Sequence, residues 1–272
     1  MKRKAYRPAI WLLLAAALLA LPVGANGEMY VEAYLGGNFA ATESFNFGAS
    51  PHPTLTYNVR VPGRFDPAVV GGLKIGTWFV KEGFLGFNYP AWMRFFGFFL
   101  DFSYHRLNLG HQRANYRETF LGLNNRGVLD FSSEGTAATL AFMFAGRYGF
   151  FPDSEVPFGR LQPYLAVGPA LLFTTQQPRF NFVRFTGPFL TDDQDMASKS
   201  NVALALAVET GLRYMALKNV SLDLSFKYRY AEPSYTYNLS AGANNFFIAP
   251  HSVTMNQTLH LFSVQLGAAY HF

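Results

Sequence analysis

The sequence contains the run Val220-Ser221-Leu222-Asp223-Leu224-Ser225-Phe226-Lys227-Tyr228-Arg229-Tyr230, in which apolar and polar residues alternate strictly. On a helix, Arg229 would lie on the side opposite to Asp223 and Lys227. On a strand they all lie on one face, because successive side chains point to opposite sides. The last segment, Phe262 to Phe272, alternates in the same way. Both segments therefore predict β-strands with one apolar face and one polar face.

Six further segments pass the same test for alternation. They are Met29–Asn38, Ala68–Phe79, Arg94–Leu107, Thr136–Tyr148, Leu161–Phe173 and Asn201–Tyr214. Each of the eight segments is long enough to cross a bilayer, which takes about 9 to 11 residues of tilted strand. The sequence thus predicts eight strands of membrane-spanning length.

The composition indicates that much of the surface of these strands faces lipid rather than water. Only 14 % of the 272 residues are charged, whereas soluble domains have about a quarter, and 17 % are aromatic. The absence of cysteine excludes a disulfide scaffold and thiolate metal sites. The long uncharged run from Leu161 to Pro178 is broken by Pro163 and Pro169, so it does not predict a spanning helix. A closed β-barrel is the other backbone that satisfies its hydrogen bonds in lipid. We therefore expect an all-β, eight-stranded antiparallel up-and-down transmembrane barrel.

The N-terminus has the three parts of a secretory signal peptide: a basic region, the apolar run Ala9–Leu21 and small residues ending at Ala25. We expect residues 1–25 to be removed, with cleavage after Gly27 as the alternative, and residues 28–272 to form the barrel domain. An uncleaved anchor is the other interpretation, but the run is short for a span of about 20 residues. Cleavage leaves 18 basic and 17 acidic residues, so the mature chain is nearly neutral and nucleic acid is not an expected partner.

The connections between the predicted strands are of two lengths. The links 80–93, 149–160 and 215–219 are modest, and the other four are long, namely 39–67, 108–135, 174–200 and 231–258. Outer-membrane barrels have short periplasmic turns and long extracellular loops, so both termini are expected in the periplasm. Parts of the long links also alternate: Ser44–Phe47, Thr54–Val59, Arg179–Phe185 and Ser234–Leu239. The strands are expected to continue above the membrane as hairpins with a sheet edge open to a partner strand, the alternative being flexible loops.

Several segments resemble a known family. The C-terminal Leu266-Gly267-Ala268-Ala269-Tyr270-His271-Phe272, with Tyr270 and Phe272, looks like the signal that the outer-membrane assembly machinery reads. Together with Gly72–Phe79, Leu161–Pro169 and Asn219–Tyr230 it resembles the small outer-membrane β-barrel domain family of opacity and OmpA-like eight-stranded barrels. The resemblance implies insertion into the outer membrane of a Gram-negative cell envelope and a structural or surface-interaction role, such as adhesion.

The alternation also assigns charged residues to the inside of the barrel. They are Glu32, Lys74, Asp101, Arg147, Glu209, Arg213, Asp223, Lys227 and Arg229. Side chains fill an eight-stranded barrel, and charges buried there must pair to offset the cost of leaving water. We expect a salt-bridged plug, with Arg213 and Asp223 paired across a tight hairpin. The alternative is a narrow channel for small or apolar solutes.

Other polar residues suggest weaker hypotheses. Arg106, Arg113 and Arg117 could bind lipopolysaccharide phosphates through paired hydrogen bonds, or they are solvated charges. Asp101, Ser103 and His105 have the residue types of a catalytic triad. Residues two apart on a strand are, however, roughly 7 Å apart, too far for a direct hydrogen bond. We expect no enzyme, cofactor or metal site, and keep a lipid A-modifying enzyme as the alternative.

Overall fold

The structure is a computed structural model that describes residues 28–41, 43–52, 55–80, 88–120, 122–184, 190–239 and 251–272. The signal peptide expected over residues 1–25 lies outside the described residues. In the described part of the chain, no helix is both long enough and apolar enough to span a membrane.

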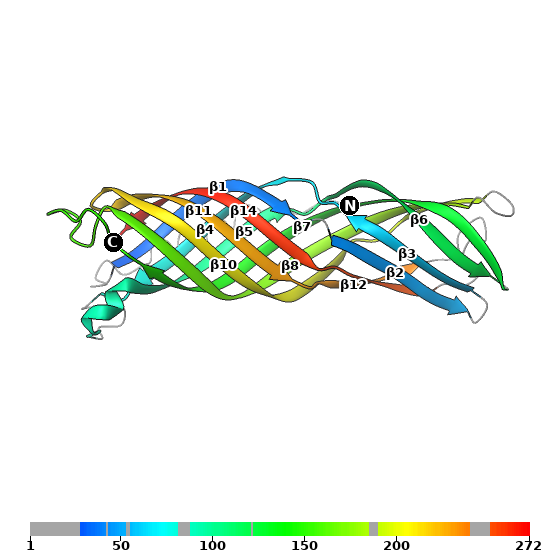
Figure 1. Ribbon diagram of the computed structural model, residues 1–272, viewed down its shortest axis with the longest axis horizontal. Coiled ribbons are helices and arrows are strands. Elements are labelled where there is room, and N and C mark those ends of the chain that lie inside the picture. The colour runs from blue at the N-terminus through cyan, green and yellow to red at the C-terminus, as the bar shows by residue number, and fades with distance from the viewer. Residues whose placement is uncertain are drawn as a thin grey trace, which may run out of the picture.

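Eight strands close into an antiparallel barrel. They are β1 (Glu28–Ala40), β4 (Ala68–Trp78), β5 (Phe96–Arg106), β7 (Leu123–Arg147), β8 (Leu161–Arg184), β10 (Lys199–Leu217), β11 (Val220–Ala231) and β14 (Leu259–His271). Each pairs with the next around the ring, and β14 pairs back with β1. The strands run obliquely to the long axis (Figure 1), as closure of a sheet into a barrel requires. The expected eight-stranded up-and-down barrel is confirmed.

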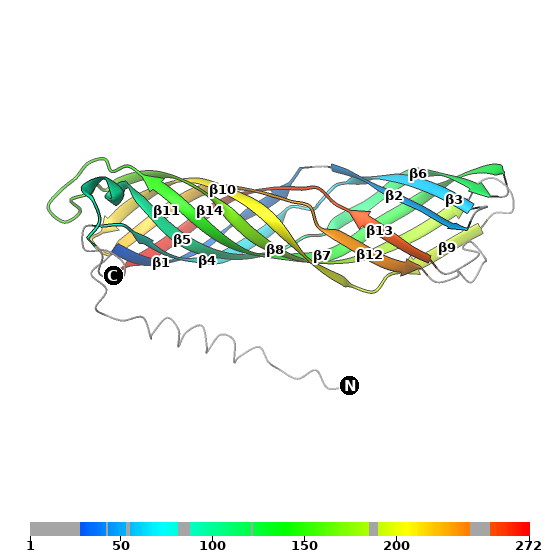
Figure 2. The same ribbon diagram turned by 90° about the horizontal axis from the view of Figure 1, so that it is seen from below.

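Beyond one end of this barrel the sheet continues as an extension. It consists of the outer parts of β7 and β8 together with β2 (Glu43–His52), β3 (Leu55–Gly63), β6 (Leu109–Phe120), β9 (Leu190–Asp195), β12 (Ser234–Leu239) and β13 (His251–Asn256). Six of these strands pair in the order β2–β3–β6–β7–β8–β9, and β12 pairs with β13. The extension lies at the end away from the C-terminus (Figure 2). The prediction that the strands continue as hairpins is confirmed, although Thr54 and Phe185 lie outside the described residues.

The apolar face of the sheet is the outer face in the barrel and the inner face in the extension. Along β7 every second residue points inward without a break in register. In the extension, Phe131 points inward and is buried while Asp130 points outward. In the barrel, Arg147 is buried inside and Phe144 is 62 % exposed on the outside. The same alternate positions point inward along the whole strand, because its two-residue period is unbroken. The change of apolar face therefore comes from the sequence, which places apolar residues at outward positions in the barrel and at inward positions in the extension.

The barrel therefore has an apolar outer belt and a lumen in which buried charges lie among apolar side chains such as Phe99, Met143 and Leu172, whereas the core of the extension is apolar. Members of that core are Val59, Val61, Leu109, Ala114, Tyr116, Leu129, Phe131, Phe180, Met196, Tyr235, Tyr237, Val253 and Met255.

One strand begins two residues later than predicted. The strand expected from Arg94 begins at Phe96, and the preceding residues form the short 3-10 helix η2 (Ala91–Phe95). Pro90 fixes its backbone at φ −58° ahead of this turn. The ring of Phe95 packs on Tyr148 and Phe158 outside the sheet ladder. This packing holds the segment out of the strand that its alternation predicted.

Candidate functional site in the barrel lumen

The structure places all nine predicted charged residues inside the barrel, each no more than 4 % exposed. The strands β1, β4, β5, β7, β10 and β11 contribute them, so the alternation of each strand alone orients its charge toward the axis. Seven of them form one connected network of ion pairs, whereas Arg147 and Arg229 bind separate partners.

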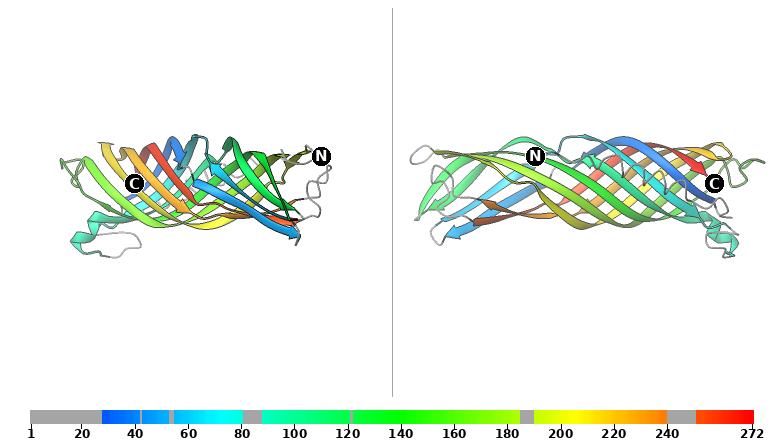
Figure 3. Two further views of the ribbon diagram at one scale, coloured as in Figure 1. Left: turned by 45° about the vertical axis from the view of Figure 1, so that its right-hand side comes forward. Right: turned by 180° about the vertical axis from the view of Figure 1, so that it is seen from behind.

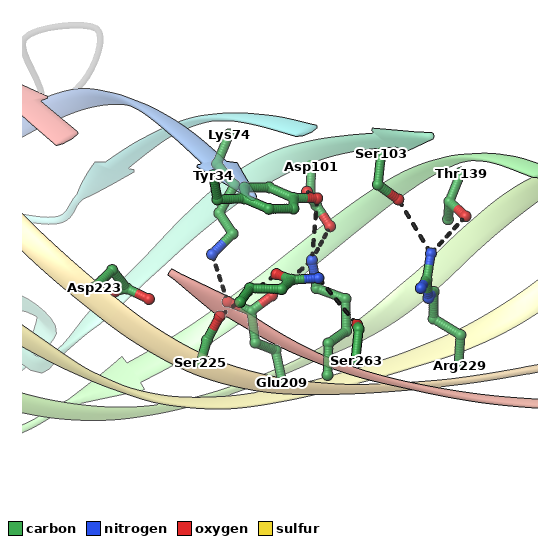
Figure 4. A network of polar contacts seen from close by, with 12 residues as sticks. Tyr34, Lys74, Asp101, Ser103, Thr139, Glu209, Asp223, Ser225, Arg229 and Ser263 are labelled. Carbon is green, nitrogen blue, oxygen red and sulfur yellow. Dashed lines mark hydrogen bonds and ion pairs between the residues drawn. The ribbon is translucent and has the colours of Figure 1, made fainter. Parts of the chain in front are cut away.

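Glu209 is the centre of this network (Figure 4). Its Oε1 accepts hydrogen bonds from Lys74 Nζ at 2.7 Å and from the Tyr164 hydroxyl at 2.7 Å. Lys227 Nζ lies 3.0 Å from its other oxygen. Lys74 also donates to Glu32 Oε1 at 2.8 Å, so each ammonium is shared by two carboxylates.

The second half of the network surrounds Tyr34. Its hydroxyl donates to Asp101 Oδ1 at 2.6 Å, and Lys227 donates to the other oxygen of Asp101. Lys74 and Lys227 lie 5.1 and 4.8 Å from the centroid of the Tyr34 ring. The ring thus provides a π-face to two buried cations in addition to the bond from its hydroxyl.

The predicted pair of Arg213 and Asp223 is present, with Nε 3.3 Å from Oδ2. The hydrogen bond of this guanidinium goes instead to Glu32 Oε2, at 2.7 Å. Arg213 also lies 4.3 Å from the centroid of the Tyr30 ring. The hairpin brings the expected partners together, but barrel closure supplies a better one.

Arg229 has no carboxylate within ion-pair distance among the described residues. Its Nη1 donates to the hydroxyls of Ser103 and Thr139 at 3.1 Å each, and its Nη2 donates to Asn38 Oδ1 at 2.7 Å. The side chain is only 1 % exposed. Three neutral oxygens bind the two Nη atoms of this buried cation, whereas its buried Nε has no hydrogen-bond partner among the described residues.

Arg147 closes the end of the barrel that holds the C-terminus. Both of its Nη atoms donate to the carboxylate of Glu28, and Nη1 also donates to Gln162 Oε1 at 3.0 Å. Its guanidinium lies between the rings of Trp78 and Phe158, 4.1 Å from each centroid. Sequence reasoning missed Glu28, although it shares the inward parity of Glu32.

Three glycines make room for the lumenal tyrosines. Gly72, Gly76 and Gly211 lie directly opposite Tyr34, Tyr30 and Tyr164 on the neighbouring strands. A Cβ at these glycines would lie 2.3, 2.7 and 2.5 Å from the facing ring. Each ring therefore lies over the glycine of the neighbouring strand, and the hydroxyls of Tyr34 and Tyr164 reach carboxylates from there.

These contacts leave little space. A hollow lined by Lys74, Phe99, Tyr164, Glu209 and neighbouring side chains has no room for the centre of a water molecule. The triad-like residues have separate partners: Asp101 binds Lys227, Ser103 accepts from Arg229, and His105 Nδ1 lies 2.8 Å from the carbonyl oxygen of Arg106. Within the described ranges no three acidic or histidine side chains are grouped so as to hold a metal ion.

The arginines predicted to bind lipopolysaccharide lie at different heights. Arg106 is exposed beside Tyr104 at the edge of the belt. Arg113 and Arg117 stand opposite Asp130 and Arg126 in the extension. With about 3.3 Å per residue and a tilt near 40°, they lie roughly 15 and 25 Å beyond Thr136, where the belt ends.

Arg113 is already engaged by a carboxylate. Its Nε donates to Asp130 Oδ1 at 2.7 Å and its Nη2 to Oδ2 at 3.2 Å. The hydrogen bonds from Arg113 lower the pKa of Asp130 below its ordinary value. Of the three arginines, Arg106 has the position that suits lipid phosphates best.

The proposed assembly-signal residues lie at the other edge of the belt. Tyr270 and Phe272 are about half exposed, and their rings meet edge to face at 5.2 Å. The backbone N–H of Phe272 donates to the carbonyl of Met29 at 2.9 Å, so the last residue is held against β1.

A closed antiparallel eight-stranded barrel with an ion-paired lumen and an apolar belt is the architecture of the small outer-membrane barrels that the sequence resembles, and the chain has this fold. No protein-family profile and no curated protein matches the sequence. Among solved structures, the chain is similar to OprG of Pseudomonas aeruginosa, with 13 % identity, a TM-score of 0.46 and coverage of 91 % of this chain and 97 % of that one.

Two further solved structures are similar to this chain. A major outer membrane protein of Thermus thermophilus has 14 % identity and a TM-score of 0.44, covering 91 % of this chain and 100 % of that one. Ail of Yersinia pestis, crystallised with a heparin analogue, has 14 % identity and a TM-score of 0.32, covering 90 % and 99 %. At these identities and scores, nothing about the function of this chain follows from the similarity.

Proposed function

We propose that the protein is an integral barrel of a Gram-negative outer membrane, with a plugged lumen and an extension that acts as a surface-interaction module. The apolar belt supports the membrane location, because large side chains such as Leu204, Leu165 and Leu266 are at least 60 % exposed on the barrel wall. The end with the C-terminus would face the periplasm, where the assembly machinery reads Tyr270 and Phe272. The extension would project outward.

The main support for this proposal is the level at which the apolar face of the sheet changes from the outside to the inside. On β8 the run of outward apolar residues that forms the belt ends at Phe173, and the next outward residue is Thr175. At nearly the same level the inner face changes from the charged network to the apolar core of the extension. A solute would have to pass the charged network and then the apolar core of the extension, so the geometry favours a plug over a channel.

The extension supports a role in binding a partner at the cell surface. Among the described strands, β9 and β12 each pair on one side only. Such edges present free backbone donors and acceptors to an added strand. An adhesion-like role with a protein partner is the function we propose for this surface, together with lipopolysaccharide contact at Arg106. We propose no enzymatic activity, because the lumenal Asp101, Ser103 and His105 have separate partners.

Planar-bilayer recording on the purified full-length protein tests the plug. We expect no steady conductance from the wild type. Sustained single-channel conductance would contradict the plug and favour the channel.

An epitope inserted at Gly122, in the turn between β6 and β7, tests the orientation, because that residue is exposed and has open space around it. We expect the epitope to be labelled on intact cells, and labelling only after lysis would contradict the proposal.

Mass spectrometry of lipid A with and without the protein should show no difference.

A further inference from the structure

Exposed aromatic side chains gather outside the barrel wall at the end that holds the C-terminus. They come from η2, the start of β5, the end of β7 and the beginning of the β7–β8 link. The exposed members are Trp92, Phe96, Tyr148, Phe150 and Phe151, between 46 and 73 % exposed. Figure 3 shows η2 standing to the side of the barrel in both views. We call this group the aromatic foot.

The aromatic foot is tied firmly to the barrel. The ring of Phe95 stacks on Tyr148 at 5.9 Å with an interplanar angle of 7°, and it meets Phe158 at 5.8 Å. Phe158 in turn covers the guanidinium of Arg147 in the lumen. Trp92 meets Phe96 edge to face at 5.9 Å. The exposed rings therefore stand on a packed base.

The backbone also holds one ring outward at a cost. Phe151 has a φ of +56° and is the one described residue other than glycine with a positive φ. A side chain with a Cβ is strained in this conformation, because the Cβ approaches the following carbonyl oxygen. The ring that it carries is 73 % exposed, so burial of Phe151 within the chain does not offset the strain.

A lipid surface is the partner that the position of the foot favours. Phe96 and Tyr148 follow directly on the outward residues of β5 and β7 that form the belt, such as Phe144. The foot is thus continuous with the lipid-facing surface. Indole and phenol rings prefer the boundary between acyl chains and headgroups, because they are apolar with one polar atom.

Arg94 gives the foot a preference for negative charge. It is exposed, and its guanidinium lies 5.0 Å from the centroid of the Phe95 ring. The acidic residues of the β7–β8 link, Asp153 and Glu155, are both bound by Arg160. A guanidinium at this level matches the phosphate of a phospholipid.

We propose that the aromatic foot lies in the headgroup region of the periplasmic leaflet and that Arg94 binds the phosphate of an anionic phospholipid there. This inference rests on the proposed membrane location, and the test below separates the two. The alternative occupant, a periplasmic protein, would leave the foot outside the lipid.

Tryptophan quenching tests the depth of the foot. The chain has Trp11, Trp78 and Trp92, and Trp78 is buried in the lumen. The full-length Trp11→Phe variant is reconstituted in vesicles whose lipids carry bromine either near the headgroup or near the terminal methyl. We expect stronger quenching by the shallow bromine, and loss of that quenching when Trp92→Phe is added, since Trp78 serves as the internal control. Equal emission in both vesicles and in plain lipid would overturn the proposal.

A second arm tests the choice of headgroup. In mixed vesicles, bromine is placed on phosphatidylglycerol or on phosphatidylcholine, and the ratio of the two quenching signals measures enrichment around Trp92. We expect a ratio above one that falls to one in Arg94→Gln and is unchanged in the control Arg60→Gln, which replaces an exposed arginine on β3 of the extension. A ratio of one in the parent protein would overturn the role of Arg94. Heat-resistant migration of vesicle-bound protein shows that the barrel itself has inserted, so an unquenched Trp92 in inserted protein refutes the foot and not the barrel.

Discussion

Arg213 and Asp223 face each other across the β10–β11 ladder, with Nε 3.3 Å from Oδ2, yet the guanidinium makes its shorter bond to Glu32 on β1. The neighbour along the hairpin is thus the weaker partner. A substitution at Asp223 leaves Arg213 paired with Glu32. A substitution at Glu209 removes one of the two carboxylates that bind Lys74 and one of the two that bind Lys227.

The Glu209→Gln variant is expected to destabilise the barrel more than Asp223→Asn. Loss of the Glu209 charge deprives Lys74 and Lys227 of a shared partner, and breaking such buried pairs costs about 3 kcal/mol. Asp223→Asn should cost about 1 kcal/mol, because Arg213 keeps Glu32. Urea unfolding of the reconstituted protein, followed by heat-resistant migration, measures both. Equal losses of stability in the two variants would contradict the central role of Glu209 in the network.

Replacing Gly72 by alanine should displace the ring of Tyr34 and weaken its bond to Asp101. A Cβ there would lie 2.3 Å from the ring and 2.4 Å from the carbonyl oxygen of Phe102. Overpacking of this kind costs about 1 to 3 kcal/mol. Gly146→Ala is the matched control, because its nearest neighbour is at 3.8 Å. If the two variants unfold at the same urea concentration, the close approach of ring and glycine is not required.

The extension should loosen separately from the barrel. Phe131 is fully buried in the apolar core of the extension, and its ring meets Phe180 at 5.1 Å. The Phe131→Ala variant removes about 3 to 5 kcal/mol of local packing. Limited proteolysis is expected to cut the extension while the barrel keeps its heat resistance. Asp130→Ala, on the outer face of the same strand, is the control and should resist the protease like the wild type.

The β7–β8 link should loosen in acid. The pKa of Asp153 lies below its ordinary 3.8, because the backbone N–H of Val156 and the side chain of Arg160 bind its carboxylate. A carboxyl group whose pKa is lowered by folding stabilises the fold above its unfolded pKa, and this stabilisation disappears as the pH falls through the folded value. Exchange of the Val156 amide hydrogen should therefore accelerate below about pH 4 relative to the intrinsic rate.

The Asp153→Asn variant is the comparison for that measurement. It lacks the ionisable group, so its corrected exchange rate at Val156 should be fast and independent of pH across the same interval. A wild-type rate that also stays constant would mean that the link is held by other contacts.

Strict alternation in the sequence predicted the eight barrel strands, the inward orientation of all nine lumenal charges and the hairpins above the belt. These properties follow from the two-residue period of a strand, which is a local rule. The helix η2 escaped prediction, because the contacts of Phe95 with Tyr148 and Phe158 join segments that are distant in the chain. Glu28 was missed at a strand end, although the parity of β1 would have found it.

The sequence by itself therefore determined which face of each strand meets lipid, water or the lumen, since a side chain's face depends only on its position along the strand. The tertiary structure alone decided which charges bind one another. Lys74 reaches Glu209 on β10, Arg213 reaches Glu32 on β1 and Arg229 binds neutral hydroxyls across the axis. These partners come from strands far apart in sequence, and closure and stagger of the barrel set the level at which each side chain meets another.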